Sequence, residues 1–263
     1  CQRFRLVKSI TMEINTILIT QARMGSTRLP GKIMKKIDDT PLLKIHLDRL
    51  RKCKNVADII VATTTLDEDL IIHELALEWG YSASRGSSDD VLDRFYKSVV
   101  NKSPDWIVRV TSDCPLLDPI IVDAVIACAQ ANNVDYCSNT LIENFPDGQD
   151  VEVFKFSALK NAWKNSKLLS EREHVTPYIR NNSDFKGESK FSAINYPCEY
   201  DFSKIRMTVD EEKDFVLIKQ LITDLGTKQS WLTYTKYIIE NNLDSINSNI
   251  IRNEGFLKSL KND

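Results

Sequence analysis

The sequence predicts an α/β fold of three layers, in which a mostly parallel β-sheet carries helices on both faces. Two observations support this prediction. Short apolar runs alternate with amphipathic stretches through the first half of the chain, and a basic loop follows the first apolar run. Alternating strands and helices place successive strands in parallel and cover both faces of the sheet. Because ligands in such folds bind beyond the carboxyl ends of the strands, the basic loop is a candidate site.

The elements of the first half follow from local patterns. Runs of mainly apolar residues predict strands at 16–20, 58–63, 106–110 and 134–138. Apolar residues three and four positions apart predict helices at 41–52, 67–79, 90–100 and 119–131. Pro41 is placed to open the first helix and Gly80 to close the second. A further strand-like stretch precedes Arg85.

The second half of the chain is less regular. Strands are predicted at 147–156, 191–196 and 206–209, and helices at 170–180, 210–225 and 229–241. Pro177 should kink or stop the first of these helices, because proline lacks the N–H that a helix interior needs.

The length of 263 residues fits one large domain. We interpret residues 12–245 as that domain, with an excursion at about 145–205 for substrate binding or dimerisation. Residues 246–263 are interpreted as a C-terminal tail. Residues 1–11 are interpreted as a leader or upstream segment, because Met12 lies just before the first strand and could be the natural start.

Composition and charge exclude several classes of protein. The formal net charge of −2 gives no general attraction to nucleic acid or to anionic membranes. No apolar run approaches the ~18 residues that cross a membrane, and the N-terminal residues lack the long apolar region of a signal peptide. The six cysteines form no C-x-x-C pair, and the three histidines offer no zinc-ligand spacing. We expect a cytoplasmic protein with reduced thiols and no nucleic-acid or membrane partner.

The loop after the first strand concentrates groups that bind phosphate. It holds two arginines, a lysine, two hydroxyl residues and two glycines within residues 21–32. Glycines let the backbone approach an anion, backbone N–H groups point at it, and cations offset its charge. A solvated surface turn is the alternative interpretation, but the density of these groups favours a triphosphate site. The predicted nucleotide contacts in the loop are Gln21, Ala22, Arg23, Gly25, Ser26, Thr27, Arg28 and Lys32.

Spacing excludes two commoner phosphate loops. A Walker A loop has four residues between its glycines and a serine or threonine after its lysine. Here five residues separate Gly25 from Gly31, and the lysine is followed by Ile33. The dinucleotide-binding pattern G-x-G-x-x-G is also absent, because Gly25 is the only glycine near the strand end.

The motif R-x-x-S-T-R-L-P-G-K at 23–32 resembles the N-terminal signature of cytidylyltransferases that make CMP-activated acidic sugars. This group includes the CMP-KDO and CMP-sialic acid synthetases, and the match is closest to the spore-coat polysaccharide type. The glycine-richer start of sugar-1-phosphate nucleotidyltransferases is missing. The resemblance implies the Rossmann-like fold of nucleotide-diphospho-sugar transferases, with CTP and a small acidic sugar as substrates. It also implies Mg²⁺ (or Mn²⁺) as cofactor and a homodimer.

Two aspartates follow predicted strands and are candidate metal ligands. Asp113 and Asp210 lie where a strand ends, and Mg²⁺ prefers one or two carboxylates together with phosphates and water. From the residues alone, Asp113 could cap a turn and Asp210 a helix. The resemblance favours metal binding, because the family has similar Asp-x-Pro and Val-Asp-x-x-x-Asp patterns. Cys114 departs from this pattern, since related synthetases often have glutamate there.

Further residues are candidates for binding the nucleotide. Arg85 would read cytosine through its fixed donors, with Ser112 and Asp90 as additional contacts. A helix N-terminus explains Asp90 equally well, because carboxylates are favourable in a first helical turn.

Candidates for binding the acceptor lie in the second half. Gln149 and Glu152 are near a turn and would read sugar hydroxyls, with a polar strand edge as the alternative. Arg172 would pair with a carboxylate through two hydrogen bonds. His174 and Tyr178 lie four positions apart and would share one face of a helix. Packing or simple surface exposure is the alternative for this group.

The resemblance implies a reaction as well. A hydroxyl of an ulosonic-type acid would attack the α-phosphate of CTP and release pyrophosphate, for surface polysaccharide or glycoconjugate synthesis. The catalytic residues would be Arg28, Lys32, Asp113 and Asp210, with the two aspartates binding the metal. One alternative is a nucleotide-sugar-dependent glycosyltransferase of similar fold, which usually has Asp-x-Asp where this chain has Thr-Ser-Asp. The other is a non-catalytic nucleotide-binding protein. The identity of the sugar stays open.

Overall fold

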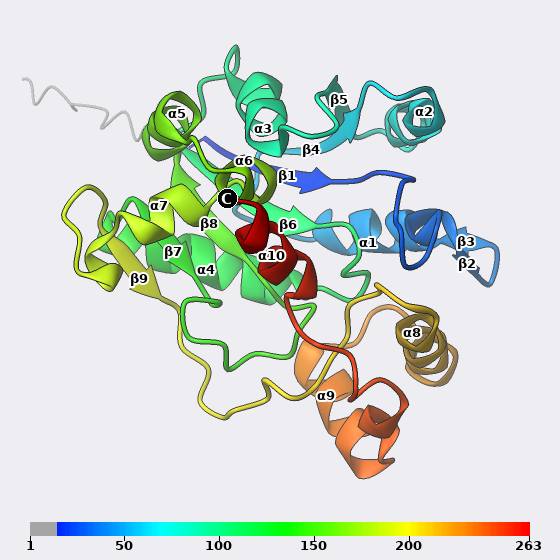
Figure 1. Cartoon of the computed structure of the whole chain (residues 1–263). Coiled ribbons are helices and arrows are strands. Elements are labelled where there is room, and N and C mark those ends of the chain that lie inside the picture. The colour runs from blue at the N-terminus through cyan, green and yellow to red at the C-terminus, as the bar shows by residue number, and fades with distance from the viewer. Residues whose placement is uncertain (1–14) are drawn as a thin grey trace, which may run out of the picture.

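A seven-stranded sheet forms the centre of the protein, with the strand order β5-β4-β1-β6-β8-β7-β9 (Figure 1). The computed structural model describes residues 15–263, so the predicted leader, 1–11, and Met12 lie outside the described residues. Among the described strands of this sheet, only β8 runs antiparallel to its neighbours. The prediction of a mostly parallel sheet is therefore confirmed.

The strands of this sheet are β1 (Thr16–Gln21), β4 (Asp58–Thr64), β5 (Ser82–Gly86), β6 (Trp106–Thr111), β7 (Tyr136–Ser138), β8 (Glu152–Lys155) and β9 (Ala193–Asn195). A separate hairpin pairs β2 (Lys36–Ile37) with β3 (Thr40–Pro41). The α-helices are α1 (Leu42–Leu50), α2 (Leu70–Glu78), α3 (Val91–Val99), α4 (Pro119–Asn132), α5 (Phe156–Asn165), α6 (Leu169–His174), α7 (Pro177–Asn181), α8 (Glu212–Leu225), α9 (Trp231–Glu240) and α10 (Glu254–Ser259). Short 3-10 turns are η1 (Lys32–Met34), η2 (Asp67–Asp69), η3 (Asp184–Lys186), η4 (Leu243–Ile246) and η5 (Leu260–Asn262).

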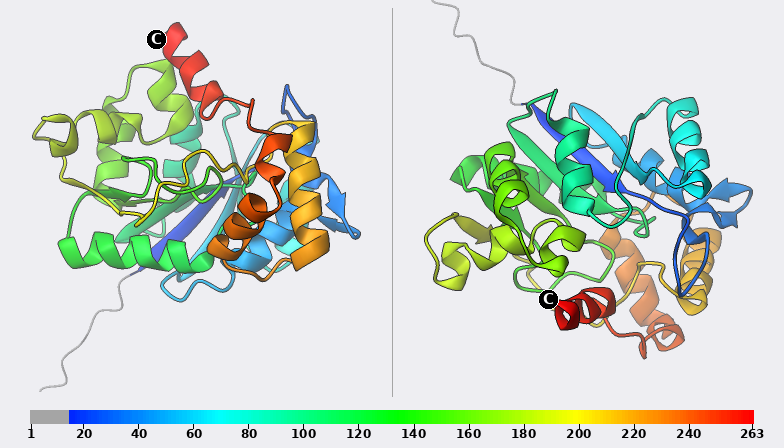
Figure 2. Two further views of the ribbon diagram at one scale, coloured as in Figure 1. Left: turned by 90° about the horizontal axis from the view of Figure 1, so that it is seen from below. Right: turned by 45° about the horizontal axis from the view of Figure 1, so that its top comes forward.

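Alternate residues of the central strand β1 face opposite layers of helices. Ile17 and Ile19 pack with α3, α5 and α7 on one face of the sheet, whereas Leu18 packs with α4 on the other. This follows from the two-residue period of a strand, which sends successive side chains to opposite faces. Figure 2 shows helices on both sides of the sheet. The three-layer prediction is confirmed.

Helices α8 and α9 pack beside α1 rather than against the sheet. Leu217, Leu221 and Tyr234 from this pair form one buried cluster with Leu42 and Ile45 of α1. The two helices, yellow-brown and orange, lie beside the blue N-terminal part in the left view of Figure 2. This packing holds the chain that enters α8 near the loops at the carboxyl edge of the sheet.

The structure corrects two predicted strands in the second half. Residues 206–209 are extended but join no sheet, and Arg206 makes an isolated bridge with Asp147. The predicted strand 147–156 is reduced to β8, because the chain turns at Gly148 and begins α5 at Phe156. Helices α5 and α10 were not predicted.

The register of β1 and β6 places two loops side by side. Gln21 and Thr111, the last residues of these parallel strands, are paired neighbours. The Ser112 hydroxyl donates to the Gln21 carbonyl at 2.7 Å, which ties the start of one loop to the start of the other. The candidate site therefore begins at the carboxyl edge of the sheet, as ligand sites in such sheets do.

Two predictions about the whole chain can be compared with the structure. No helix within residues 15–263 has the length and apolar character needed to cross a membrane. The cysteines of this part are free thiols, as expected: Cys53, Cys114, Cys128, Cys137 and Cys198.

Candidate active site

The basic loop after β1 is folded back on itself and hydrogen-bonded to η2, the turn before α2. The Gly31 N–H donates to the Met24 carbonyl at 3.0 Å, which closes the loop. Gly31 has a φ of 64°, a conformation that glycine adopts without steric cost. The buried carboxylate of Asp69 accepts the Met24 N–H at 2.6 Å. Asp69 escaped the sequence analysis, because a charged residue at a helix start normally indicates only a cap.

Lys32 lies between the two predicted metal ligands. Its ammonium donates to Asp113 Oδ2 and to Asp210 Oδ1, each at 2.8 Å. Residues 81 and 178 positions from Lys32 in the chain thus meet at one cation. Burial alone would raise the pKa of Asp113, but the Lys32 charge and hydrogen bond hold that pKa well below its usual range. The pKa of Lys32 is raised, because its two carboxylate partners outweigh its own burial.

Backbone contacts bring Asp210 to Asp113. The Val209 N–H donates to the Asp113 carbonyl at 2.8 Å, and the Thr208 hydroxyl donates to the same carbonyl at 3.2 Å. The extended segment before α8 therefore lies against the loop after β6. The sequence analysis had instead predicted this segment as a strand of the sheet. This pairing sets the two aspartates side by side.

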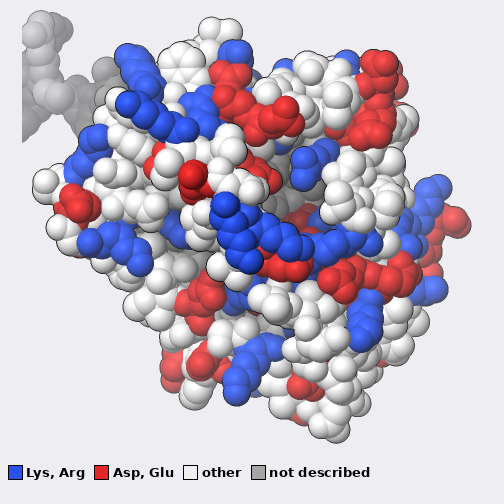
Figure 3. All heavy atoms as spheres, in the orientation of Figure 1, with Lys and Arg blue, Asp and Glu red and all other residues white. Residues whose placement is uncertain are grey.

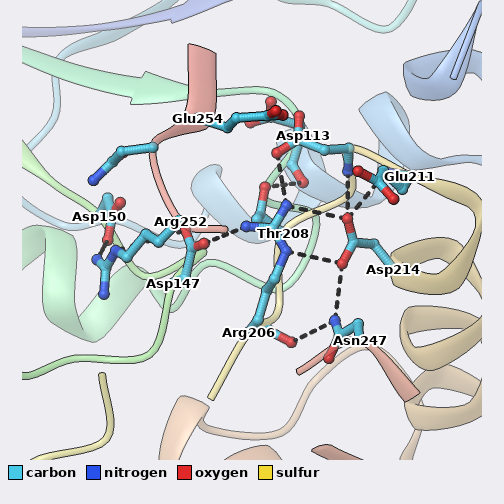
Figure 4. A network of polar contacts seen from close by, with 12 residues as sticks. Asp113, Asp147, Asp150, Arg206, Thr208, Glu211, Asp214, Asn247, Arg252 and Glu254 are labelled. Carbon is cyan, nitrogen blue, oxygen red and sulfur yellow. Dashed lines mark hydrogen bonds and ion pairs between the residues drawn. The ribbon is translucent and has the colours of Figure 1, made fainter. Parts of the chain in front are cut away.

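Arg206 lies in a cluster of charges with Asp147 and Asp214 (Figure 4) and is hydrogen-bonded to Asp210. Its guanidinium donates to Asp210 Oδ2 at 2.7 Å, to Asp147 Oδ2 at 2.5 Å and to Asp214 Oδ1 at 2.9 Å. The Arg206 side chain is 6% exposed and that of Asp214 is fully buried. Burial would lower the pKa of Arg206, but its carboxylate partners raise it above the usual range. The Asp210 N–H also donates to Asp214 Oδ2 at 2.9 Å, so the backbone of Asp210 is fixed as well.

Arg206 and Asp214 carry a signal that could have identified this cluster. Arg206 interrupts an otherwise largely apolar run, and Asp214 is the last residue of the Val-Asp-x-x-x-Asp pattern. Charged residues are rarely buried unless they are paired, so an arginine here predicts a buried acidic partner.

Gly148 permits the close approach of the turn that carries Asp147. A Cβ built on Gly148 would lie 2.6 Å from the carbonyl carbon of Met207, and the φ of Gly148 is 101°. The Met207 N–H donates to the Asp147 carbonyl at 2.7 Å. A side chain at position 148 would therefore push the turn away from the segment that carries Arg206 and Asp210.

Arg28 extends the positive charge toward the outside of the site. Its guanidinium lies 3.1 Å from Asp210 Oδ1 and 3.1 Å from Glu254 Oε2, with Glu211 at 3.7 Å. In the space-filling view, basic and acidic side chains lie next to each other across the middle of this face, along the edge of a hollow (Figure 3). Arg28 and Lys32 are thus on the same side of the molecule as Asp113 and Asp210.

Other predicted nucleotide residues make contacts within the protein. Arg85 donates to the carbonyls of Thr64 and Leu66, both at 2.9 Å. Asp90 caps α3 by accepting the Asp93 N–H at 2.8 Å. It also accepts hydrogen bonds at 3.0 Å from Arg172, the residue predicted to bind a substrate carboxylate. The structure thus pairs Asp90 with Arg172, which the sequence analysis had assigned to different ligands.

The predicted helix face shared by His174 and Tyr178 does not exist. Helix α6 ends at His174, and Val175 has a φ of 72°, so α7 begins a new direction at Pro177. His174 Nε2 lies 3.0 Å from the Ser259 hydroxyl, whereas the Tyr178 hydroxyl accepts from Lys190 at 2.5 Å. The helix break was expected at Pro177, but it falls two residues earlier because Val175 leaves the helical region.

Gln149 and Glu152 are buried in the fold. The Gln149 side chain accepts the Asp118 N–H at 2.9 Å and donates to the Leu116 carbonyl at 3.1 Å. Glu152 pairs with Arg109 and accepts the Tyr136 hydroxyl at 2.6 Å. Burial would raise the pKa of Glu152, but Arg109 and the hydroxyl groups of Thr176 and Tyr136 lower it. Both side chains therefore satisfy buried partners rather than line the surface.

Comparison with known proteins gives this arrangement a family. Residues 17–250 match the protein family described as Cytidylyltransferase. This chain belongs to the cytidylyltransferase family. The spore coat polysaccharide biosynthesis protein SpsF of Bacillus subtilis is 34% identical to it over 221 residues, which cover 82% of this chain and 90% of that protein.

Solved structures agree with this family. A cytidylyltransferase from Leptospira borgpetersenii serovar Hardjo-bovis has a TM-score of 0.80 at 33% identity, over 91% of this chain and 98% of that one. A CMP:2-keto-3-deoxy-manno-octonic acid synthetase, solved with CTP, has a TM-score of 0.57 at 15% identity, over 80% and 99% of the chains. The predicted family, fold and enzyme class are confirmed, and the glycosyltransferase and non-catalytic alternatives are set aside.

The donor set of this cytidylyltransferase fits a hard divalent cation. Asp113 Oδ2 and Asp210 Oδ1 already face one shared cation, the Lys32 ammonium, and carboxylate oxygens are what Mg²⁺ prefers. No group of three or more histidine, cysteine, aspartate or glutamate side chains within residues 15–263 is arranged to hold a metal. Phosphate oxygens and water would therefore complete the coordination, as is usual for Mg²⁺ bound with a nucleotide.

Proposed function

We propose that this cytidylyltransferase transfers CMP from CTP to an acidic sugar of the ulosonic type and releases pyrophosphate. The observation that carries the proposal is the convergence of Arg28 and Lys32 on Asp113 and Asp210 at the carboxyl edge of the sheet. The family supports the cytidylyl donor. The fold shared with a synthetase solved with CTP supports the nucleotide, and the acid in that synthetase's name supports the acceptor class.

The chain's own residues supply positioning and charge. A hydroxyl of the acceptor attacks the α-phosphorus in line and releases its proton to solvent, the bond from that phosphorus to the bridging oxygen breaks, and pyrophosphate leaves. Arg28 and Lys32 bind the departing phosphates, and preorganised cations are most effective where negative charge develops. Asp113 and Asp210 would hold the divalent cation, which supplies Lewis-acid stabilisation when bound. Arg206 orients the Asp210 carboxylate through its hydrogen bond to Oδ2. The reaction needs no covalent enzyme intermediate, so alignment supplies much of the rate.

The remaining loop residues are proposed as contacts for the triphosphate. Backbone N–H groups around the exposed Gly25 and Thr27 lie at the outer turn of the loop, where an anion can approach. Arg23 is also exposed there. The acceptor is proposed to bind on the side of α6 and α7, where His174 lies. Helix α10 links this side to the nucleotide side, because its Ser259 contacts His174 and its Glu254 contacts Arg28.

A screen for pyrophosphate release tests the activity. Four nucleoside triphosphates are crossed with KDO-type, sialic, pseudaminic and legionaminic acids in the presence of Mg²⁺. We expect release only with CTP and with one class of acid. Release with a neutral sugar 1-phosphate instead, or with a purine nucleotide, would contradict the proposal.

Substitution of the two aspartates tests the assignment of the site. Asp113→Asn and Asp210→Asn should each lower kcat at least 100-fold, because each removes an anionic ligand for the cation. Glu78→Gln, which changes an exposed carboxylate on α2, is the matched control and should retain full activity. Wild-type turnover in both aspartate variants would move the catalytic centre elsewhere.

We also propose that the protein forms a homodimer through its excursion. Four large apolar side chains are exposed between residues 145 and 205: Leu168, Leu169, Phe185 and Tyr200. Burial of such side chains is favourable on association. Light scattering after gel filtration should give twice the mass of 30.1 kDa, and a monomer at micromolar concentration would refute the dimer.

A further inference from the structure

The C-terminal residues 247–263, called here the strap, run from the charge cluster around Arg206 to helix α6. At the start of the strap, Asn247 donates to Asp214 Oδ1 at 2.8 Å, and Asp214 also accepts the Asp210 N–H. Further along, Arg252 donates to Asp150 Oδ1 at 2.8 Å. The strap therefore starts within the buried charge cluster at Asn247 and leads past Arg252 to Glu254 (Figure 4), which contacts Arg28 of the loop after β1. Most of it lies beyond residue 250, where the match to the family ends.

Glu254, the first residue of α10, forms an ion pair with Arg28, which is proposed to bind the triphosphate. Glu254 Oε2 lies 3.1 Å from the Arg28 guanidinium, and Glu254 Oε1 accepts from Lys258 at 2.8 Å. A carboxylate on Arg28 has the same charge type and the same acceptor chemistry as a phosphate oxygen. The side chain of Glu254 thus takes a hydrogen-bond position that the nucleotide's triphosphate would need.

The far end of the strap covers the side proposed for the acceptor. The Phe256 ring meets the His174 ring edge-on, with 5.1 Å between centroids, and the Arg180 guanidinium lies 5.6 Å over Phe256. The Ser259 hydroxyl lies 3.0 Å from His174 Nε2 and donates to Glu173 at 2.6 Å. Figure 1 shows α10, in red, in front of the central strands and beside α6. One short helix therefore contacts residues proposed for both substrates.

We propose that the strap is a gate on which the nucleotide acts: the triphosphate displaces Glu254 from Arg28, α10 moves off His174, and the acceptor side opens. The proposal rests on the function proposed above. It implies an order of binding, with the nucleotide first and the acid second. Opening the strap exchanges the Glu254–Arg28 ion pair for a phosphate–Arg28 ion pair. Because exposed ion pairs contribute little free energy, the closed strap would lower the affinity for nucleotide only modestly.

The first test measures nucleotide affinity by isothermal titration without acceptor. Glu254→Gln removes the competing anion, so its Kd for CTP should be about two- to fivefold lower than that of the wild type. Glu240→Gln, on the exposed end of α9, is the matched control and should bind CTP like the wild type. Unchanged CTP affinity in Glu254→Gln would overturn the competition between Glu254 and the triphosphate.

The second test follows the strap itself by hydrogen exchange. Saturating CTP should increase deuterium uptake at residues 254–259, and tripolyphosphate alone should do the same. Unchanged or decreased uptake with bound CTP would overturn the gate. If CTP fails to bind but tripolyphosphate binds and opens the strap, the proposed donor is wrong and the gate stands. If neither anion binds, Arg28 is not a phosphate ligand and both proposals fail.

Discussion

The Lys32 ammonium keeps Asp113 and Asp210 close together, in the arrangement that a divalent cation would need. The ammonium is placed between carboxylates that would repel each other without it, at 2.8 Å from each. The side chains are only partly exposed, so solvent does not fully screen that repulsion. The same repulsion is what a divalent cation would relieve.

Lys32→Met should therefore make stability depend on divalent cations. We expect the free energy of unfolding to fall by about 1–3 kcal/mol, because Asp113 and Asp210 lose their shared partner, and millimolar Mg²⁺ to restore part of the loss. Urea denaturation with and without Mg²⁺ measures both effects. Lys44→Met, which removes an exposed ion pair with Asp48 on α1, is the control and should change stability by less than about 1 kcal/mol. An equal response of both variants to Mg²⁺ would contradict the shared cation position.

Arg206 should be harder to replace than any exposed arginine. Arg206→Lys keeps the charge but loses the planar fork that reaches three carboxylates, so we expect a loss of about 3–5 kcal/mol in unfolding free energy. Binding of Mn²⁺, followed by electron paramagnetic resonance, should weaken as well, because Asp210 loses the donor that orients it. Arg51→Lys on the surface after α1 is the control. Unchanged Mn²⁺ binding in a folded Arg206→Lys protein would show that Arg206 serves the fold alone.

Some helices and strands are determined by their own residues, and others by contacts with distant parts of the chain. The predicted strands 16–20 and 58–63 and the helix 119–131 match β1, β4 and α4 closely, because their apolar periodicity and caps lie within the element. The segment 206–209 has the residue pattern of a strand, yet its N–H groups bond to the loops at Asp113 and Asp147. That choice depends on tertiary neighbours, which a single sequence does not show.

The candidate site divides in the same way. Arg28, Lys32, Asp113 and Asp210 could be identified because each belongs to a motif of fixed spacing. Asp147 and Glu254 could not, because each reaches the site through chain that has no motif of its own. The predicted C-terminal tail, 246–263, is a packed strap for a similar reason: Glu254 and Ser259 contact residues more than eighty positions away, Arg28 and His174.

The turn at Gly148 tests how strictly one element positions another. Gly148→Ala must fit a methyl group 2.6 Å from a backbone carbon at a φ of 101°, so we expect a loss of more than about 3 kcal/mol in unfolding free energy. Gly187→Ala also has a positive φ, of 83°, but meets nothing within 4 Å, so it should cost about 1 kcal/mol. Thermal and urea denaturation of the two variants measure the difference. Equal losses would mean that the backbone conformation, and not the close approach, matters at Gly148.

The N-terminal and C-terminal halves of the chain both contribute residues to the candidate site. The loop after β6 supplies Asp113, the loop after β1 supplies Lys32, and the segment before α8 supplies Asp210, because the α8–α9 pair packs on α1. Contacts far apart in the sequence therefore define the site, and unfolding of any one part should remove the others' partners. Global stability is then the right measure of a residue that ties these parts together.

His46 is such a residue, and it should make the whole protein sensitive to acid. It is fully buried on α1, with Nδ1 at 2.9 Å from the Cys114 carbonyl and Nε2 at 3.0 Å from the Thr20 hydroxyl. Burial lowers its pKa from 6.5 to about 4. Since the unfolded chain takes up this proton first, the contribution of His46 to stability is complete above pH 6.5 and is lost as the pH falls toward 4.

By pH 5 this contribution should have fallen by about 2 kcal/mol. His46→Gln retains a donor and an acceptor but cannot titrate, so its unfolding free energy should drop about 2 kcal/mol less than that of the wild type between pH 7.5 and pH 5. Urea denaturation at the two pH values measures the drop, and groups that titrate in both proteins cancel in the comparison. His73→Gln on α2 controls for loss of an imidazole elsewhere. If wild type and His46→Gln lost the same stability, His46 would not be the buried neutral group that joins α1 to β1 and to the loop after β6.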